Sequence, residues 1–333
     1  MVYLVIVYYD ITTVHLFSAK KTHSFRPIRE DEIAQFVARI SARISTRPES
    51  RNQAVNLSEM AIELGSTLIC RIAFGKRYEE GGPEMRRFDG LLKRAQGVMA
   101  AFYVSDYFPA FGWVDRLCGS VGRLERAFRD LDSFYQELID EHLGPNRPVT
   151  MKDDILDTLI QLKQSKTCSV DFTWDNIKGL LMNIFIAATD TSSTSIIWTM
   201  TTLIKAPQVM HKVQAEIRNL IGKRGKVDED DLPKLSYMKA VINEVFRLYP
   251  PAPLLVPRET IEKCTLDGYE VQPKTIVYVN AWAIARDPEF WENPNVFLPE
   301  RFLDSKIEIK GHDFGVVPFG AGRRVVPGCL WGS

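Results

Sequence analysis

One segment constrains the fold more than any other: 173–207, TWDNIKGLLMNIFIAATDTSSTSIIWTMTTLIKAP, has no proline before Pro207. As one helix it would be about 45 Å long, and its apolar residues occur on every face. We therefore expect a buried helix through the middle of the fold. A membrane span from Leu180 to Met200 is the alternative, but Asn183, Asp190 and the Thr/Ser cluster from Thr189 to Ser195 would be costly in lipid.

Helical periodicity dominates the rest of the chain. In 29–44, Ile33, Phe36, Val37 and Ile40 recur at three- and four-residue intervals after an acidic first turn, which predicts an amphipathic helix. Similar patterns predict helices in 54–74, 124–144, 207–222 and 234–250, and one short helix between two connections in 144–172.

Period-two patterns are confined to the last third of the chain, in 254–260, 265–271 and 275–282. The first ten residues, MVYLVIVYYD, are too short to cross a bilayer and lack a cleavage site, so we expect a buried strand there and neither a signal nor an anchor. The patterns together predict a mainly α fold with a smaller β region. No linker is long enough to separate domains, so we expect 1–333 to form a single domain.

Charge and cysteine content exclude several classes of protein. Forty-two basic and forty-two acidic residues give no net charge and are scattered along the chain, which argues against a nucleic-acid partner. The five cysteines form no C-x-x-C pair, which indicates a reducing compartment and argues against a structural metal.

The segment AATDTS, residues 187–192, lies at the centre of the long predicted helix. Two alanines leave room above the backbone, and Asp190 with Thr191 sets an acid beside an alcohol, which suits a bound molecule that needs protons. The alternative is that the hydroxyls only bond back to the carbonyl four residues earlier and bend the helix.

Glu244 and Arg247 are three residues apart on one predicted helix face, so the carboxylate and the guanidinium can meet. Such a pair is usually a solvated surface bridge. Its neighbours here are apolar, which suggests partial burial, and Arg301 could complete a fork to Glu244. We expect this network to have a structural role and no part in bond-making.

The stretch PFGAGRRVVPGC, residues 318–329, is typical of a loop that holds an anionic or planar ligand. Its glycines let the backbone turn tightly, and Arg323 and Arg324 could pair with carboxylates or phosphates. No dinucleotide or P-loop pattern is present, and the loop could also be an ordinary basic turn.

In this order, the motifs resemble those of the cytochrome P-450 family, of the plant microsomal type and similar to its families 71 and 83. The resemblance starts near Thr12 and extends over essentially the rest of the chain. The motifs are Ala187-Ala188-Thr189-Asp190-Thr191-Ser192, Glu244-x-x-Arg247, Pro299-Glu300-Arg301-Phe302 and Phe319-x-x-Gly322-x-Arg324-x-Val326-x-Gly328.

The resemblance implies a haem-dependent monooxygenase that oxidises a small apolar, secondary-metabolite-like substrate with O2 and electrons from an NADPH-cytochrome reductase. It also implies an endoplasmic-reticulum membrane location; for this chain, in which we expect no anchor, a soluble protein is the alternative. Peripheral membrane contact would come from residues such as Phe108, Phe111 and Trp113, although such residues are more often core.

The resemblance also implies roles for individual residues. Those expected to serve oxygen and haem are Asp190 and Thr191 for proton delivery, Ala188 in the oxygen groove, Arg258 and Arg324 at the haem propionates, and Phe319 beside the proximal ligand. Those expected to stabilise the fold are Glu244, Arg247 and Arg301. Those expected to line the substrate are Ile184, Phe185, Ala187, Pro253, Leu254, Leu255 and Val256.

The resemblance fails at one position. Val326 stands where the family has the cysteine whose thiolate binds iron, and valine has no lone pair to offer. Cys329 lies three residues further on and could ligate only if the loop shifted. We also expect an incomplete family fold, truncated at both ends. The alternative function is therefore a catalytically inactive family member that is at most a haem or lipophile binder.

Overall fold

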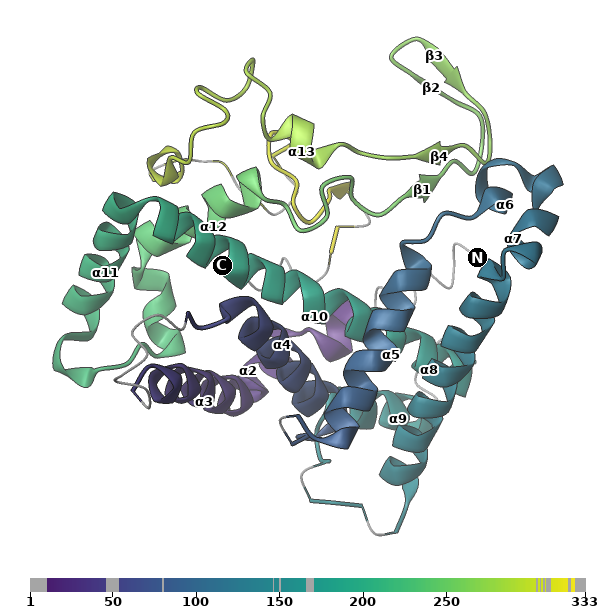
Figure 1. Cartoon of the computed structure of the whole chain (residues 1–333), viewed down its shortest axis with the longest axis horizontal. Coiled ribbons are helices and arrows are strands. Elements are labelled where there is room, and N and C mark those ends of the chain that lie inside the picture. The colour runs from purple at the N-terminus through teal and green to yellow at the C-terminus, as the bar shows by residue number, and fades with distance from the viewer. Residues whose placement is uncertain are drawn as a thin grey trace. The chain divides into compact units, whose positions relative to one another are not determined.

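The computed structural model describes residues 11–45, 54–79, 81–145, 147–149, 151–165, 171–303, 305, 307, 309, 313–322 and 325–326. The chain divides into two compact units, residues 1–193 and 194–333. Figure 1 shows the elements of both units. The expectation of a single domain stays a prediction, and the strand expected at residues 1–10 lies outside the described residues.

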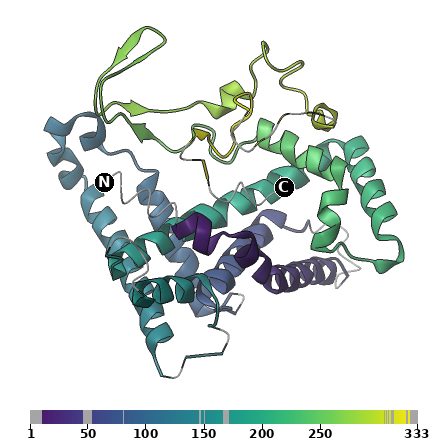
Figure 2. The same ribbon diagram turned by 180° about the vertical axis from the view of Figure 1, so that it is seen from behind.

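The described part of unit 1 is helical. Its elements are the π-helix η1 (Ile11–Leu16), α2 (Ala19–Ser24), α3 (Arg26–Ser45), α4 (Leu57–Phe74), α5 (Pro83–Met99), α6 (Val104–Tyr107), the 3-10 helix η2 (Pro109–Phe111), α7 (Trp113–Leu117), α8 (Ser120–Leu143), α9 (Ile155–Ser165) and most of α10 (Trp174–Lys205). Figures 1 and 2 show α5 and α8 running alongside each other. The helices expected in 29–44, 54–74, 124–144 and 144–172 are therefore confirmed.

Aromatic side chains form much of the core of unit 1. Phe88 of α5 meets Phe185 of α10 edge to face, with ring centroids 4.3 Å apart. Phe134 and Tyr135 of α8 and Phe74 of α4 complete the cluster. Edge-to-face pairs add to the free energy gained from apolar burial alone. The cluster ties four helices to one another.

The long helix α10 forms as expected, but only one face of its unit 1 part is buried. The buried positions Ile177, Leu181, Phe185 and Thr189 recur every four residues, whereas Asn183, Ala187, Asp190 and Thr191 are exposed. The expectation of burial on every face was wrong, because the neighbouring helices cover one side of this part. Among the described residues, α10 is the one helix long and apolar enough to cross a membrane, and 33% of its most apolar window is buried.

Only part of the apolar stripe expected on α3 is covered. Phe36 and Ile40 are half-buried, but Ile33 and Val37 are 50% and 54% exposed, while Glu32 is 1% exposed. The Glu32 carboxylate accepts a hydrogen bond from Arg71 of α4 and forms an ion pair with Arg77 at 3.0 Å. A buried carboxylate needs such partners. These ion pairs, rather than apolar periodicity, decide which face of α3 is turned inward.

The segment 102–117 carries exposed aromatic side chains: Phe108, Phe111 and Trp113 are 59%, 53% and 57% exposed. The buried carboxylate of Asp115 accepts the N–H groups of Val104 at 2.9 Å and Ser105 at 2.8 Å. These two bonds fix α7 to the start of α6. The sequence left open whether these aromatic residues lie on the surface or in the core, and the structure favours the surface.

Unit 2 combines helices with two small antiparallel sheets. Its elements are the end of α10, α11 (Pro207–Ile221), η3 (Gly222–Arg224), η4 (Glu229–Lys234), α12 (Ser236–Leu248), β1 (Arg258–Glu259), β2 (Cys264–Leu266), β3 (Tyr269–Val271), β4 (Ile276–Val277), α13 (Ala281–Ile284) and η5 (Pro299–Phe302). β1 pairs with β4 and β2 pairs with β3. The mainly α fold with a smaller β region is confirmed.

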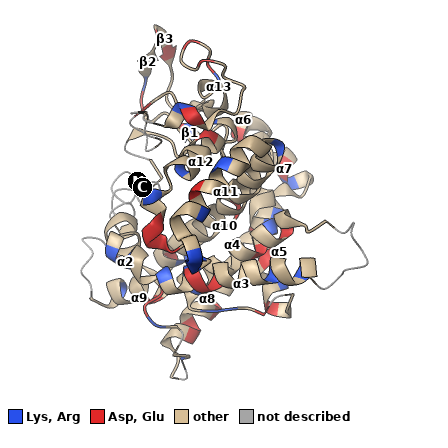
Figure 3. Ribbon diagram, turned by 90° about the vertical axis from the view of Figure 1, so that its left-hand side faces the viewer, with Lys and Arg blue, Asp and Glu red and all other residues tan. Residues whose placement is uncertain are grey.

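Local sequence accounts for several boundaries in unit 2. Asp267 and Gly268 both have positive φ, 48° and 81°, as the two-residue hairpin turn between β2 and β3 requires. The N-terminus of α12 is capped from α11, because the Glu216 carboxylate accepts the N–H groups of Tyr237 at 2.7 Å and Met238 at 2.9 Å. In the view of Figure 3, acidic and basic residues are interspersed along the helices.

Candidate functional site

The network of Glu244, Arg247 and Arg301 that was expected from the sequence is present in unit 2. Arg247 of α12 donates from Nε and Nη2 to the two oxygens of Glu244, each at 2.8 Å. Arg301 of η5 donates from Nε to Glu244 Oε1 at 3.0 Å, and the N–H of Leu298 reaches the same oxygen at 3.0 Å. The side chains of Glu244 and Arg247 have no exposed surface. The pair is therefore not a solvated surface bridge.

The two guanidinium groups also hold backbone carbonyls. Arg247 Nη1 donates to Ala285 O at 2.6 Å and to Pro294 O at 2.8 Å, and Arg301 Nη1 donates to Glu292 O at 2.9 Å. A buried charge pair is tolerated when its remaining donors are satisfied in this way. The network therefore fixes the segment 285–298 to α12.

Trp291 connects this network to the segment that leads into the glycine-rich loop. Its ring lies 5.0 Å from the Arg247 guanidinium and 5.7 Å from that of Arg301. Its indole Nε1 donates to Gly315 O at 3.0 Å. Phe319, four residues further on, packs against Phe246 of α12 with ring centroids 5.2 Å apart. Trp291 thus holds the segment that leads into the loop, and Phe246 of α12 contacts the start of the loop itself.

Left-handed backbone shapes the loop itself. Gly320 and Gly322 have φ of 77° and 73°, conformations that other residues rarely adopt. A Cβ on Gly320 would lie 3.8 Å from both Leu255 Cδ1 and Arg258 Nη2. The loop, the expected substrate segment 253–256 and Arg258 therefore meet at this glycine.

The expected substrate segment is largely open to solvent. Leu254 and Val256 are 47% and 76% exposed, Pro253 is also exposed, and Leu255 is half-buried. Leu255 has φ of 52°, which is a strained value for a residue with a Cβ. Strain of this kind persists only where surrounding contacts impose it, and the turn bond from Leu255 N to Ala252 O at 3.0 Å is one such contact.

In unit 1, the AATDTS segment makes the helix bonds that its alternative interpretation describes. Thr191 Oγ1 donates to Ala187 O at 2.6 Å and Thr189 Oγ1 to Phe185 O at 3.1 Å. Ser193 Oγ lies within hydrogen-bond distance of Thr189 O and of Ala61 O in α4. The hydroxyls are therefore engaged with backbone, as mid-helix Ser and Thr commonly are.

The Asp190 carboxyl lies on the open face of α10. Partial burial raises its pKa above the ordinary value, and a side-chain hydrogen bond with Gln96 of α5 acts in the opposite direction. Ala188 is half-buried beside it. Ile184 and Phe185, expected to line the substrate, are 9% and 0% exposed and belong to the core of unit 1.

Haem-thiolate chemistry requires an axial donor atom, and the described part of the glycine-rich loop does not supply one. Val326 is 48% exposed, and its N–H bonds to Phe319 O at 3.0 Å, but its side chain carries no donor. Among the described residues, no group of His, Cys, Asp and Glu could hold a metal ion. Arg324 and Cys329 lie outside the described residues. The described part of the glycine-rich loop therefore offers no axial donor to a haem iron.

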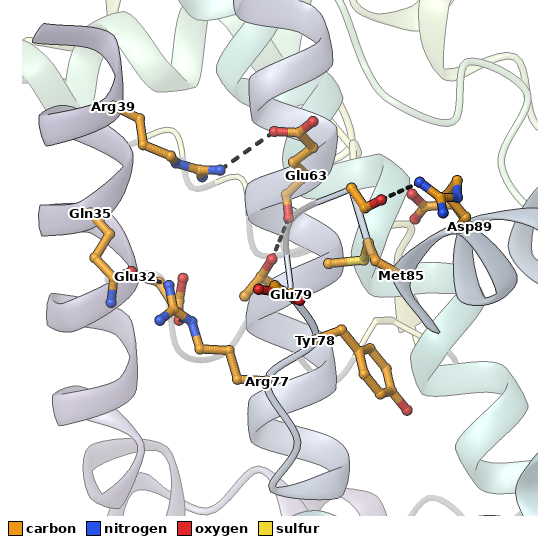
Figure 4. A pocket seen from close by; sticks show the side chains of 12 residues that line it. Glu32, Gln35, Arg39, Glu63, Arg77, Tyr78, Glu79, Met85 and Asp89 are labelled. Carbon is orange, nitrogen blue, oxygen red and sulfur yellow. Dashed lines mark hydrogen bonds and ion pairs between the residues drawn. The ribbon is translucent and has the colours of Figure 1, made fainter. Parts of the chain in front are cut away.

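Unit 1 also contains a pocket that sequence analysis did not find. It has a volume of about 510 Å³ and lies between α3, α4 and the segment 76–89 (Figure 4). Its charged side chains pair largely with one another, Arg39 with Glu63 at 3.5 Å and Arg77 with Glu32 at 3.0 Å. No residue predicted from the sequence lines it, and no pattern in the sequence brings α3 and α4 together.

Comparison with known proteins identifies similar chains. The Cytochrome P450 family model matches residues 10–329. The 6,7,8-trihydroxycoumarin synthase of Pastinaca sativa is 47% identical, over 95% of this chain and 62% of that protein. The strychnine-11-hydroxylase of Strychnos nux-vomica is 43% identical, over 96% of this chain and 61% of that protein. A zebra fish cytochrome P450 structure with progesterone is 27% identical with a TM-score of 0.75, covering 98% of this chain and 70% of that one. This chain thus spans about 62% of the length of the curated relatives that it matches.

Proposed function

Because the chain belongs to the cytochrome P450 family, we propose that its fold serves the family's haem-dependent monooxygenation of a small apolar, secondary-metabolite-like substrate. The reaction would use O2 and electrons from an NADPH-cytochrome reductase. The observation that carries the proposal is the connection from the Glu244–Arg247–Arg301 network through Trp291 to Gly315. That connection supports the loop on which a proximal ligand would have to stand.

Position 326 decides whether this chain retains the reaction. The backbone of Val326 is held to Phe319 O, but an isopropyl group cannot bind iron. This single observation favours a second candidate function, a catalytically inactive family member that is at most a haem or lipophile binder. Both candidate functions use the same glycine-rich loop. They differ in whether a residue of that loop binds the haem iron.

The test is the carbon monoxide difference spectrum of the reduced, haem-supplied protein, with Val326→Cys beside the unchanged chain. Val325→Cys is the matched control, because it adds a thiol one residue away. A thiolate-type Soret band in Val326→Cys alone would support a preserved haem site whose ligand was lost at Val326. A band in the unchanged chain that Cys329→Ser removes would mean that Cys329 ligates. No band in any variant would overturn the proposal.

The named roles of the site residues form part of the proposal. Asp190 and Thr191 would hold and pass protons, with Ala188 beside them, and Arg258 and Arg324 would pair with haem propionates. Phe319 would pack beside the proximal ligand. The raised pKa of Asp190 supports its part, since an acid that holds its proton longer is a better proton donor near neutral pH.

The substrate class follows from the apolar character of a segment proposed to contact the substrate. Leu254, Leu255 and Val256 of unit 2 offer few hydrogen-bonding groups. Apolar lining selects by size and shape rather than by polar groups. The relatives named as a trihydroxycoumarin synthase and a strychnine hydroxylase support small secondary metabolites as candidates.

We further propose an endoplasmic-reticulum membrane location, with contact through the aromatic segment 102–117. Phe108, Phe111 and Trp113 are all more than half exposed on α7 and the turns before it. Exposed aromatic side chains on short helices are suited to the interface between water and lipid.

A further inference from the structure

The charges of α8 are segregated along the helix. Residues 120–129 contain three arginines and one acidic residue, whereas residues 130–143 contain five acidic residues and no lysine or arginine. The helix dipole favours the opposite order, with acids in the first turn and cations in the last. Arg123 instead lies in the first turn, and Asp140 and Glu141 lie in the last. Helix stability therefore does not explain this order.

The acidic half of α8 is explained by its packing, because its carboxylates pair with other segments of unit 1. The pairs are Asp130 with Arg94 of α5 at 3.3 Å, Asp132 with Lys178 of α10 at 2.9 Å, Glu137 with Arg87 of α5 at 2.7 Å, and Glu141 with Lys76. Each pair joins α8 to a segment that is distant in the sequence. These four acids thus serve the tertiary structure of unit 1.

The arginines of the first half have no comparable partner. Arg123, Arg126 and Arg129 are exposed, and none of them forms an ion pair with another residue that the structure describes. Arg123 donates to Ser120 Oγ at 3.0 Å, and Arg129 donates to Glu125 O at 3.4 Å. Both acceptors are neutral oxygens, so they do not compensate the charge of the guanidinium groups. Three positive charges therefore face solvent on one helix.

Helix geometry places the three arginines along one side of α8. Residues three apart are neighbours on a helix surface, and at 1.5 Å per residue the positions 123 and 129 are about 9 Å apart along the axis. The helix α7, which ends the aromatic segment 102–117, contacts the start of α8 (Figure 1). The arginines therefore follow closely on the exposed side chains of Phe108, Phe111 and Trp113.

A lipid surface with negative charge matches this order of side chains. Aromatic side chains settle at the boundary between hydrocarbon and headgroups, and the headgroup layer on each side of a bilayer is about 5–8 Å thick. Arginines that are spread over about 9 Å reach across that layer, since long basic side chains keep their charge at the interface. A guanidinium binds phosphate and carboxylate oxygens through two parallel hydrogen bonds. The basic half of α8 thus has the chemistry and the length to bind anionic headgroups.

We propose that Arg123, Arg126 and Arg129 form an arginine row that makes unit 1 prefer negatively charged lipid surfaces. The proposal rests on the membrane contact of the segment 102–117 proposed above and adds the class of lipid. The aromatic side chains supply binding to any bilayer, and the arginine row supplies the preference for anionic headgroups such as phosphatidylserine. One basic side chain near such a surface strengthens binding about fivefold, so the three together strengthen it about 100-fold.

The experiment is sedimentation of the full chain with two kinds of vesicle, phosphatidylcholine alone and phosphatidylcholine with about one-third phosphatidylserine. The unchanged chain should bind the vesicles that contain phosphatidylserine about 100-fold more tightly, and added salt should reduce this preference. Arg123→Gln/Arg126→Gln/Arg129→Gln should bind both kinds of vesicle alike, as tightly as the unchanged chain binds phosphatidylcholine. The three positions are exposed, so this variant should fold, and its thermal unfolding checks that.

The matched control is Arg218→Gln/Lys223→Gln/Lys239→Gln, which removes the same charge from exposed positions of unit 2 and should keep the preference. A triple arginine variant that still prefers phosphatidylserine, or an unchanged chain without any preference, would overturn the arginine row and leave the aromatic contact standing. An unchanged chain that sediments with neither kind of vesicle would overturn both proposals.

Two further outcomes separate the arginine row from its alternatives. Sedimentation with phosphatidylserine vesicles alone, lost in the triple arginine variant, would support the arginine row and overturn the aromatic contact. Binding of soluble heparin as tight as the binding of phosphatidylserine vesicles, and lost in the same variant, would assign the arginines to a soluble polyanion and overturn the preference for lipid.

Discussion

Arg247 holds both oxygens of Glu244 at 2.8 Å, and neither side chain has any exposed surface. Lysine in place of Arg247 could not make this two-pronged contact and also reach Ala285 O and Pro294 O. We expect Arg247→Lys to lower the free energy of unfolding of unit 2 by about 3–5 kcal/mol, since it leaves a buried carboxylate incompletely paired. Urea unfolding of the haem-free protein measures this.

The exposed pair Lys263 and Glu270, 53% and 62% exposed, is the control for that variant. Lys263→Met should change the free energy of unfolding by less than about 1 kcal/mol, because solvent screens a surface pair. An Arg247→Lys variant as stable as Lys263→Met would contradict the structural role of the network.

Gly65 of α4 lets the backbone of α4 approach α10 closely. A Cβ there would lie 2.6 Å from Ser193 Oγ and 2.9 Å from Thr189 O, and the latter is backbone that cannot move alone. We expect Gly65→Ala to destabilise unit 1 by about 1–3 kcal/mol. Gly179→Ala in α10, where nothing lies within 4 Å, should instead stabilise it by up to about 1 kcal/mol. Thermal or urea unfolding would refute the close approach if both variants had the same effect.

The pKa of Asp190 is raised mainly by partial burial, so the folded chain disfavours its charged form. The stability of the unchanged protein should therefore fall as pH rises through the interval between the unfolded and folded pKa of Asp190. Asp190→Asn removes the charge. At pH 7 it should be more stable than the unchanged protein by less than about 1 kcal/mol, because solvent screens a partly exposed group. This difference in the free energy of unfolding should vanish at more acidic pH. Urea unfolding of both proteins at several pH values checks this, and a difference that grows toward acidic pH would contradict the raised pKa of Asp190.

The exposed aromatic segment predicts binding to lipid surfaces. Removing two large apolar side chains in Phe108→Ser/Trp113→Ser should weaken partitioning into phosphatidylcholine vesicles more than tenfold, since each fully buried side chain contributes about 1.5–3 kcal/mol. Tyr269→Ser, on the β2–β3 hairpin and 76% exposed, is the matched control and should leave sedimentation with vesicles unchanged. An equal loss of vesicle binding in the two variants would mean that the segment 102–117 does not make the membrane contact.

Sequence analysis predicted most of the long helices but missed α5 (Pro83–Met99), and it predicted the pair within one helix correctly. Glu244 and Arg247 could be paired because three-residue spacing on a helix is a local property, and Arg301 followed from its motif. The pocket between α3 and α4 and the buried contact of His142 with Asp154 could not be predicted. They depend on which helix ends meet, and no spacing along the chain encodes that meeting.

The sequence by itself predicted most of the long helices, the region of the strands and the family of the chain, because periodicity, proline, glycine and short motifs act over a few residues. It also predicts that Val326 stands at the position of the family's ligand. Only the tertiary structure decided which faces are buried. Ile33 and Val37 of α3 are exposed while Glu32 is buried, since Arg71 and Arg77 come from other segments to pair with it. Likewise, the unit 1 part of α10 buries only one face, because neighbouring helices cover only that side although apolar residues occur on every side.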